Sequence, residues 1–125
     1  MNEKINISGE AKLLRIFVGE SDKYGSIPVY EKIVLDARKF GLAGATVFKG
    51  IMGYGGSSVI HTTKVLRLSE DLPLIIEIVD TSEKIDSFIP QLKSIFEHAD
   101  SGGLITLEKA EIIKYAAGNK SKHQL

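Results

Sequence analysis

The chain has 125 residues, of which 43% are apolar and 26% are charged, and its 16 Lys and Arg balance its 16 Asp and Glu. This length is typical of one domain, and zero net charge argues against a dedicated nucleic-acid-binding protein. Cysteine is absent, which excludes disulfide frameworks and cysteine-based zinc sites. The sequence starts without a signal-peptide pattern and has no apolar run near the ~20 residues of a membrane span, so we expect a cytoplasmic protein.

The first third of the chain predicts a strand followed by a helix. Residues 1–10 are polar and are expected to form a flexible segment or an added edge segment ahead of a single domain at 11–117, which a flexible tail at 118–125 follows. The run KLLRIFVG at 12–19 is short and apolar, which predicts a strand. Apolar residues then recur at helical spacing from Tyr30 to Phe40. Ser26 is expected to cap this helix, Pro28 to lie in its first turn, and Gly41 to end it.

The remaining elements alternate in the same way. A second strand is expected near 45–51, with 65–68 as an extension of a ribbon, and LIIEIV at 74–79 is the strongest strand pattern of the chain. Helical spacing returns from Ile85 to Phe96. Pro90 predicts either a kink or a restart with Ser87 as the cap. After a turn at 101–103, residues 105–107 and 110–115 predict the last strand.

The order β-α-β-β-α-β predicts an α+β, ferredoxin-like fold, in which both helices pack on one face of a four-stranded antiparallel sheet. Apolar residues alternate on both faces of the first strand, with Leu14 and Ile16 on one face and Leu13 and Phe17 on the other. An uncovered apolar sheet face would be an unusual exposed patch. We therefore expect the second face to be buried against copies of the same chain.

A glycine-rich segment joins two strand patterns in the middle of the chain, and its residues are Gly53, Tyr54, Gly55, Gly56, Ser57 and Ser58. Consecutive small residues expose many backbone N–H groups and favour either an anion or a protein partner. The segment matches neither the P-loop nor the dinucleotide-binding pattern, and a flexible hairpin tip is the alternative interpretation.

The runs GLAGATVFKGIMGYG, SSVIHTTKVLRLSEDLP and IIEIVD resemble the PII-like family of uncharacterised proteins, the domain-of-unknown-function group one-ninety, over about residues 11–115. The resemblance implies a ferredoxin-like fold and a homotrimer, as in PII signalling proteins and the CutA group. It also implies a regulatory protein rather than an enzyme. Adenine nucleotides would bind in clefts between subunits, with the base of the loop at 53–64 as one wall and the turn at 101–104 as another.

The same resemblance sets expectations for ligand and partner. The loop lacks the tyrosine and the arginine-lysine pattern that PII proteins use for modification and phosphate contact, and the turn at 101–104 has no lysine or arginine. AMP or a cyclic nucleotide is therefore a better expectation than a triphosphate. The loop at 53–64 would act as the effector element toward a membrane transporter or channel, and no cofactor is required.

Several polar side chains are candidates for ligand contact, each with an ordinary alternative. Lys49 could pair with a phosphate or protect a sheet edge, and His61 could stack on a base, accept a hydrogen bond or be a polar loop residue. Asp80 could accept from a ribose hydroxyl or a base amine, or cap a helix near Ser82. Gly102 and Gly103 could lie close to a phosphate or form an ordinary turn. The predicted binding residues are Lys49, Gly53, Tyr54, Gly55, Gly56, Ser57, Ser58, His61, Asp80, Gly102 and Gly103. No catalytic residue is predicted, and the scattered histidines predict no metal site.

Two other function classes share this order of elements. A small phosphate-ester or acyl phosphate enzyme needs an arginine cradle and an asparagine that holds water, but residues 53–58 lack arginine and the three asparagines lie in the tails. An RNA-binding module stacks bases on aromatic residues of an open sheet face. The first strand offers Phe17, but the last strand offers no matching aromatic pair.

Overall fold

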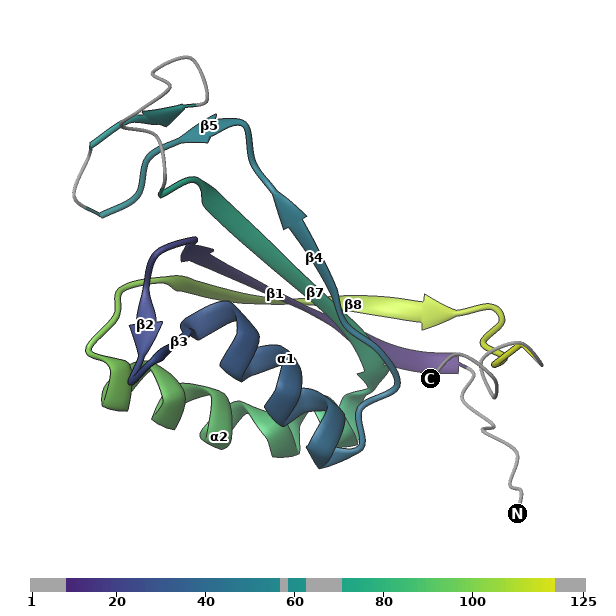
Figure 1. The fold of residues 1–125 in the computed structure, drawn as a ribbon. Helices are drawn as coiled ribbons and strands as arrows, with labels where there is room; N and C mark the ends of the chain where they lie inside the picture. Colours follow the sequence, from purple (N-terminus) through teal and green to yellow (C-terminus); the bar gives the residue numbers. More distant parts are fainter. Residues whose placement is uncertain (1–8, 57–58, 63–70, 119–125) are drawn as a thin grey trace.

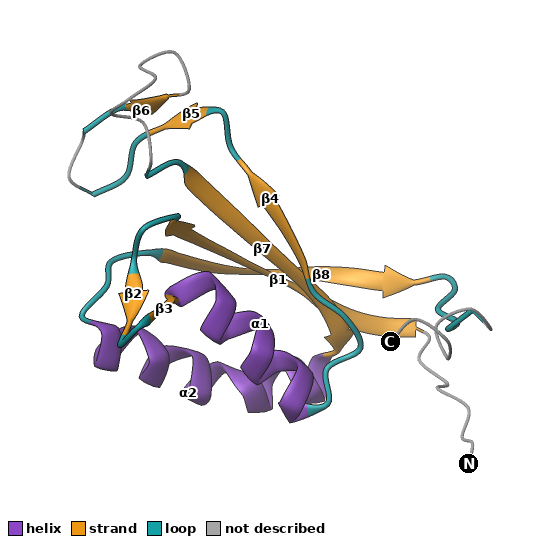
Figure 2. Cartoon of the chain, in the orientation of Figure 1, coloured by secondary structure: helices purple, strands orange, loops and turns teal. Residues whose placement is uncertain are grey.

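The computed structural model describes residues 9–56, 59–62 and 71–118, and it has the expected α+β architecture. A four-stranded antiparallel sheet has the strand order β4-β7-β1-β8, and both helices lie on one of its faces (Figure 1; Figure 2). The sheet strands are β1 (Gly9–Gly19), β4 (Thr46–Lys49), β7 (Pro73–Thr81) and β8 (Leu104–Ile112). The helices are α1 (Val29–Phe40) and α2 (Ser82–Ala99). Two small ribbons pair β2 (Lys23–Tyr24) with β3 (Ile27–Pro28) and β5 (Met52–Gly53) with β6 (His61–Thr62).

Helix α1 begins later than its sequence signals predict. Ser26 does not cap it, because Pro28 occupies the N-cap position with an extended backbone and no side-chain cap. The residues before the helix instead form the β2–β3 ribbon, which takes up the stretch that would have made its first turn. The expected end is confirmed, since Gly41 adopts a left-handed φ of 97° and its N–H donates to the Arg38 carbonyl.

Helix α2 runs without interruption through Pro90, so a restart at Ser87 is wrong. Its cap is Thr81, whose side-chain oxygen accepts from the Lys84 N–H at 3.3 Å. Proline removes one helical hydrogen bond. The apolar face of the helix offsets this loss, because four of its residues are buried in the core: Ile85, Phe88, Leu92 and Ile95.

The core lies between the helices and one face of the sheet, as the alternation in the strands predicts. It includes Leu14, Ile16 and Val18 from β1 and Leu74, Ile76 and Ile78 from β7. Each fully buried side chain of this size contributes roughly 1.5–3 kcal/mol relative to exposure. Neither helix of the described residues is long and apolar enough to cross a membrane.

The strands differ from their expected limits mainly at their ends. Strand β1 starts at Gly9, so residues 9–10 are paired with β8. Strand β4 is shorter than expected, and β8 is one continuous strand that ends at Ile112. The expected ribbon extension at 65–68 lies outside the described residues, as does most of the predicted tail.

The second face of the sheet is only partly apolar. One row across the sheet joins Phe48, Ile75, Phe17 and Leu104, and two of these are about half exposed, Phe48 at 47% and Leu104 at 54%. The next row contains Arg15 and Glu77, which form an ion pair. The alternation of apolar residues in the central strands does not predict this charged strip.

Candidate functional site

The two glycine-rich segments are the loop at 53–64 and the turn at 101–104. Both leave the sheet at the same end. Lys49, the last residue of β4, pairs with Leu74, while Gly19 pairs with Pro73 and Phe17 with Leu104. The ends of β4 and β1 therefore adjoin the starts of β7 and β8. Because β4 and β8 are the two edge strands, the loop and the turn are separated by three strand spacings, roughly 14 Å.

The base of the long loop is fixed to the start of β7. The β5–β6 ribbon extends beyond the end of the sheet (Figure 1). The Gly50 N–H donates to the Pro73 carbonyl at 2.7 Å. A Cβ added to Gly50 would lie 2.9 Å from Pro73 Cγ, and one added to Gly53 would lie 3.1 Å from the same atom. Gly53 thus has a packing role, whatever it contributes to a ligand.

The next residues of the loop, 54–56, are exposed and loosely surrounded. A Cβ on Gly55 or Gly56 would meet nothing within 4 Å among the described atoms, and Tyr54 is 71% exposed. This part of the backbone is accessible to a ligand or a partner. His61 lies in β6 opposite Gly53. Ser57 and Ser58 lie outside the described residues.

The two glycines of the turn before β8 also differ in how closely they are packed. A Cβ on Gly103 would lie 2.6 Å from Phe96 Cε1 and 2.9 Å from the Phe17 carbonyl oxygen, so close packing explains this glycine. A Cβ on Gly102 would meet no atom of residues 9–56, 59–62 or 71–118 within 4 Å. The Ser101 hydroxyl donates to Asp22 at 3.1 Å, which ties the turn to the loop after β1.

Acidic side chains surround this end of the sheet. Asp22 accepts from the Gly19 N–H at 3.0 Å, and Asp71 accepts from the Ser21 N–H at 2.9 Å. Lys49, a predicted phosphate contact, pairs with Glu20 at 2.9 Å. Asp22 and Asp71 could not be predicted as neighbours from the sequence, because the pairing of β1 with β7 brings together residues about fifty positions apart. No trio of His, Asp and Glu in the described ranges could hold a metal ion.

Asp80 lies at the other end of β7 from the loop. Its side chain is fully buried, and its two oxygens accept from the Ala43 N–H at 2.9 Å and the Thr81 N–H at 2.6 Å. These bonds fasten the connection between α1 and β4 to the end of β7. Within one chain, Asp80 is therefore not part of the same site as the glycine-rich segments, and it does not cap α2.

A shallow hollow of about 470 Å³ lies near Asp80 at this far end. The segment after β8 lines it, and the Tyr115 hydroxyl donates to the Ala43 carbonyl at 3.0 Å. Its walls are mostly apolar and include Val79, Ala110 and Ile112. The sequence analysis did not identify this hollow, because it assigned residues 110–115 to a strand.

Comparison with known proteins confirms the family resemblance. The family model described as "Uncharacterized ACR", DUF190, matches residues 11–112. A UPF0166 protein of Aquifex aeolicus is 42% identical over 102 residues, which cover 82% of this chain and 92% of that protein. A UPF0166 protein of Methanocaldococcus jannaschii is 38% identical over 105 residues, which cover 84% of this chain and 94% of that protein.

Solved structures show the same fold. One is CPII, a nitrogen regulatory PII-like protein from Thiomonas intermedia, bound to ADP, AMP and bicarbonate. Its TM-score is 0.62 at 15% identity, and the match covers 84% of this chain and 90% of that chain. A CPII structure with ADP, AMP and acetate has a TM-score of 0.56 at 15% identity, and the match covers 94% of this chain and 97% of that chain. At these identities the likeness shows the fold alone. The chain therefore belongs to the DUF190 family, together with its UPF0166 relatives, and has the ferredoxin-type fold of PII-like proteins.

Proposed function

We propose that this protein is a regulatory homotrimer that binds a small adenine nucleotide, AMP or a molecule of similar charge, in clefts between subunits. The loop at 53–64 is its effector element, and a membrane transporter or channel is its partner. The protein acts by binding and needs no cofactor.

The observation that carries this proposal is the placement of the two glycine-rich segments. Open backbone at Gly55, Gly56 and Gly102 lies at one end of the sheet, beyond opposite edge strands. Successive N–H groups in such segments favour the oxygens of a phosphate. A ligand that contacts either segment lies at the lateral border of the chain, where a neighbouring copy forms the rest of the cleft. The bound ADP and AMP in the CPII structures agree with an adenine nucleotide as the ligand class.

The charges at this end favour a ligand with few phosphates. Asp22 and Asp71 lie in the loops beside β1 and β7, and the positive charge of Lys49 is already paired with Glu20. A triphosphate would bring several further negative charges toward these carboxylates, at a Coulomb cost that grows with each phosphate. One phosphate, held by backbone N–H groups, avoids most of this repulsion.

The composition of the loop supports its role toward a partner. Ile51 is 76% exposed and Tyr54 is 71% exposed, and Met52, Val59 and Ile60 are each more than half exposed. Exposed apolar groups gathered on one projecting ribbon are typical of an interaction surface. The ribbon is held at its base through Gly50 and Pro73. A nucleotide bound beside this base would change the order of the loop.

Calorimetric titration with AMP, ADP, ATP and cyclic AMP tests the ligand. We expect AMP or cyclic AMP to bind more tightly than ATP, and Lys49→Met to weaken binding. Lys39→Met, at an exposed position on α1, is the matched control and should bind as the wild type does. If none of the four nucleotides gives heat at millimolar concentration, the proposal is wrong. Native mass spectrometry of the same material tests the trimer.

A further inference from the structure

We infer that the apolar hollow where β7 and β8 end is a binding site for a small carboxylate with an alkyl chain, and that Lys114 pairs with its carboxylate group. The hollow lies at the opposite end of the sheet from the glycine-rich segments, so this site is separate from the one proposed for a nucleotide. It is formed within one chain and goes beyond the proposed function.

The segment after β8 forms one wall of the hollow. Strand β8 is an edge strand, and β1 lies between it and β7. The Tyr115 hydroxyl nevertheless donates to the Ala43 carbonyl at 3.0 Å, and the Ala43 N–H donates to Asp80 near the end of β7 at 2.9 Å. The segment therefore reaches past the start of β1, where Ala11 is fully buried, to the end of β7. It closes one side of a space that the sheet alone would leave open.

The floor of the hollow is apolar and consists of Val79, Ala110 and Ile112. These positions alternate along their strands with the residues that face the helices, so they lie on the other face of the sheet. Val79 is 39% exposed, which leaves apolar surface in contact with water. An alkyl chain in the hollow would remove this surface from water, which is favourable.

The size of the hollow limits the length of the chain. Its volume of about 470 Å³ corresponds to roughly fifteen groups of the size of a water molecule, at about 30 Å³ each. Because the hollow is shallow, part of this volume remains with solvent. An alkyl carboxylate of about six to ten carbons fits within this limit, whereas a nucleotide has too many atoms.

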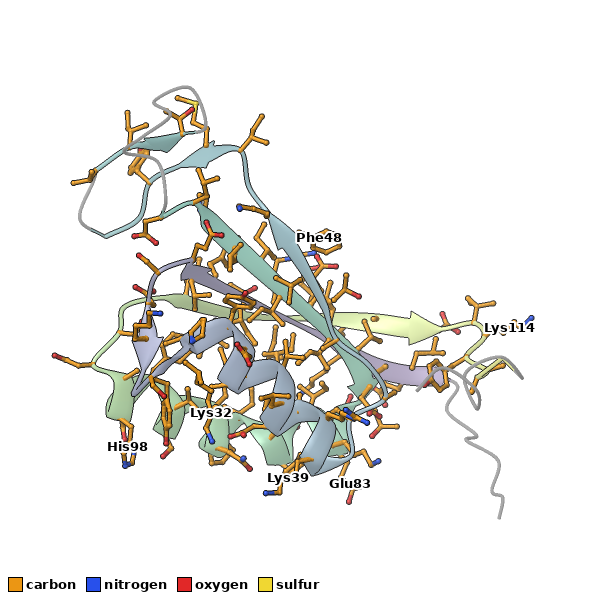
Figure 3. The ribbon with its side chains drawn as sticks, viewed as in Figure 1. Lys32, Lys39, Phe48, Glu83, His98 and Lys114 are labelled. Atoms are coloured by element: carbon orange, nitrogen blue, oxygen red, sulfur yellow. The ribbon has the colours of Figure 1, made fainter. Side chains whose placement is uncertain are left out.

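The charges at the rim favour an anionic head group. Among the described residues that line the hollow, Lys114 is the only cation, and Figure 3 shows it just past the end of β8. It forms no ion pair within residues 9–56, 59–62 and 71–118. Glu111 also borders the hollow, but it is opposite Glu10 in the register, on the helix side of the sheet. An unpaired ammonium beside apolar walls is complementary to a molecule with one negative group and an apolar chain.

The chain length and the charge of the ligand provide the first test. We expect calorimetric titration of the full chain with hexanoate, octanoate and decanoate to show an affinity that rises by about two- to fourfold for each buried methylene. Octylammonium has the same alkyl chain as an octyl anion but the opposite charge, and it should bind more weakly than octanoate. In ¹H–¹⁵N NMR spectra, octanoate should shift the amide signals of residues 43, 79 and 110–115. Equal affinity for octylammonium, or shifts that lie elsewhere, would overturn the inference.

Lys114→Met removes the proposed cation, and Lys109→Met is its matched control. Lys109 is also exposed and also forms no ion pair within the part of the chain that the structure describes. It is opposite Lys12 in the register and lies on the helix side of the sheet. We expect Lys114→Met to weaken octanoate binding by about two- to fivefold, as for an exposed ion pair, and Lys109→Met to bind as the wild type does.

Ala110→Leu fills the floor of the hollow, and Ala116→Leu, at an exposed position that does not line it, is its control. We expect the first variant to weaken octanoate binding by roughly tenfold or more and the second to leave it unchanged. Circular dichroism confirms folding, and Lys114→Met decides the matter if Ala110→Leu does not fold. Unchanged octanoate binding by folded Ala110→Leu contradicts the inference. If that variant also changes the size of the assembly in sedimentation velocity, the hollow is instead a contact between copies.

Discussion

Gly103 and Gly102 are adjacent, and the structure assigns them different roles. Replacement of Gly103 by alanine places a methyl group 2.6 Å from the Phe96 ring and 2.9 Å from the Phe17 carbonyl oxygen. The ring could move by a few tenths of an ångström, but the carbonyl belongs to the central strand β1 and cannot. Overpacking of this kind costs about 1–3 kcal/mol, and we expect the upper half of that range because a backbone atom is involved.

Gly102→Ala is the internal control for this prediction. In the part of the chain that the structure describes, no atom lies within 4 Å of the added methyl group, and the backbone at Gly102 is not in the left-handed region. Alanine at a compatible position stabilises by roughly 0.4–1 kcal/mol, because it restricts the unfolded chain. The two variants should therefore shift the free energy of unfolding in opposite directions. For a domain of this size the difference corresponds to roughly 4 °C in Tm for each kcal/mol.

Urea denaturation of both variants at one protein concentration is the assay, since assembly makes stability concentration-dependent. Equal midpoints for Gly103→Ala and Gly102→Ala would refute the packing argument. Titration with AMP then separates the packing role of Gly103 from the ligand contact proposed for Gly102. If the turn contacts phosphate, Gly102→Ala should weaken binding while it leaves the fold intact.

Three further substitutions test other contacts. Asp80→Ala removes the buried acceptor of the Ala43 N–H and should destabilise the fold by about 1–3 kcal/mol in urea denaturation. Tyr115→Phe removes only the hydroxyl that donates to the Ala43 carbonyl, and it should cost about 0.5–1.5 kcal/mol and speed hydrogen exchange in residues 113–118. Glu20→Gln breaks the ion pair with Lys49, whose side chain is 55% exposed, so the free energy of unfolding should change by less than about 1 kcal/mol. The affinity for AMP in calorimetric titration should rise, because Lys49 is released.

Much of the fold could be predicted because local patterns and packing agree. The alternation in β1 and β7 and the helical spacing around Ile33 and Phe88 identify the core faces, and Gly41 ends α1 as expected. The failures occur where a distant contact outweighs a local preference. Pro90 does not interrupt α2, because the buried face of the helix continues on both sides of it.

The surroundings of the candidate site were harder to predict for a related reason. Its acidic character comes from Asp22 and Asp71, which strand pairing brings to the same end of the sheet. Asp80 was expected near a ligand or as a helix cap, and its backbone partner at Ala43 is 37 residues away. A carboxylate at a strand end gives no local sign of whether it accepts from a ligand or from a neighbouring loop.

The glycine pattern that first suggests a phosphate site serves two purposes. A side chain at Gly50 would collide with Pro73, and one at Gly103 would collide with Phe96 and the Phe17 carbonyl. A Cβ at Gly53 would be in tight contact with Pro73, so packing accounts for all three glycines. Packing against the described residues does not account for Gly55, Gly56 and Gly102, because a methyl group at each would meet none of their atoms within 4 Å. The proposed anion site therefore depends on this second group of glycines, whose members lie at one end of the sheet, beyond its two edge strands. A hairpin tip would explain the pair in the loop and an ordinary turn would explain Gly102, so a weaker affinity of Gly102→Ala for AMP is the result that favours the anion.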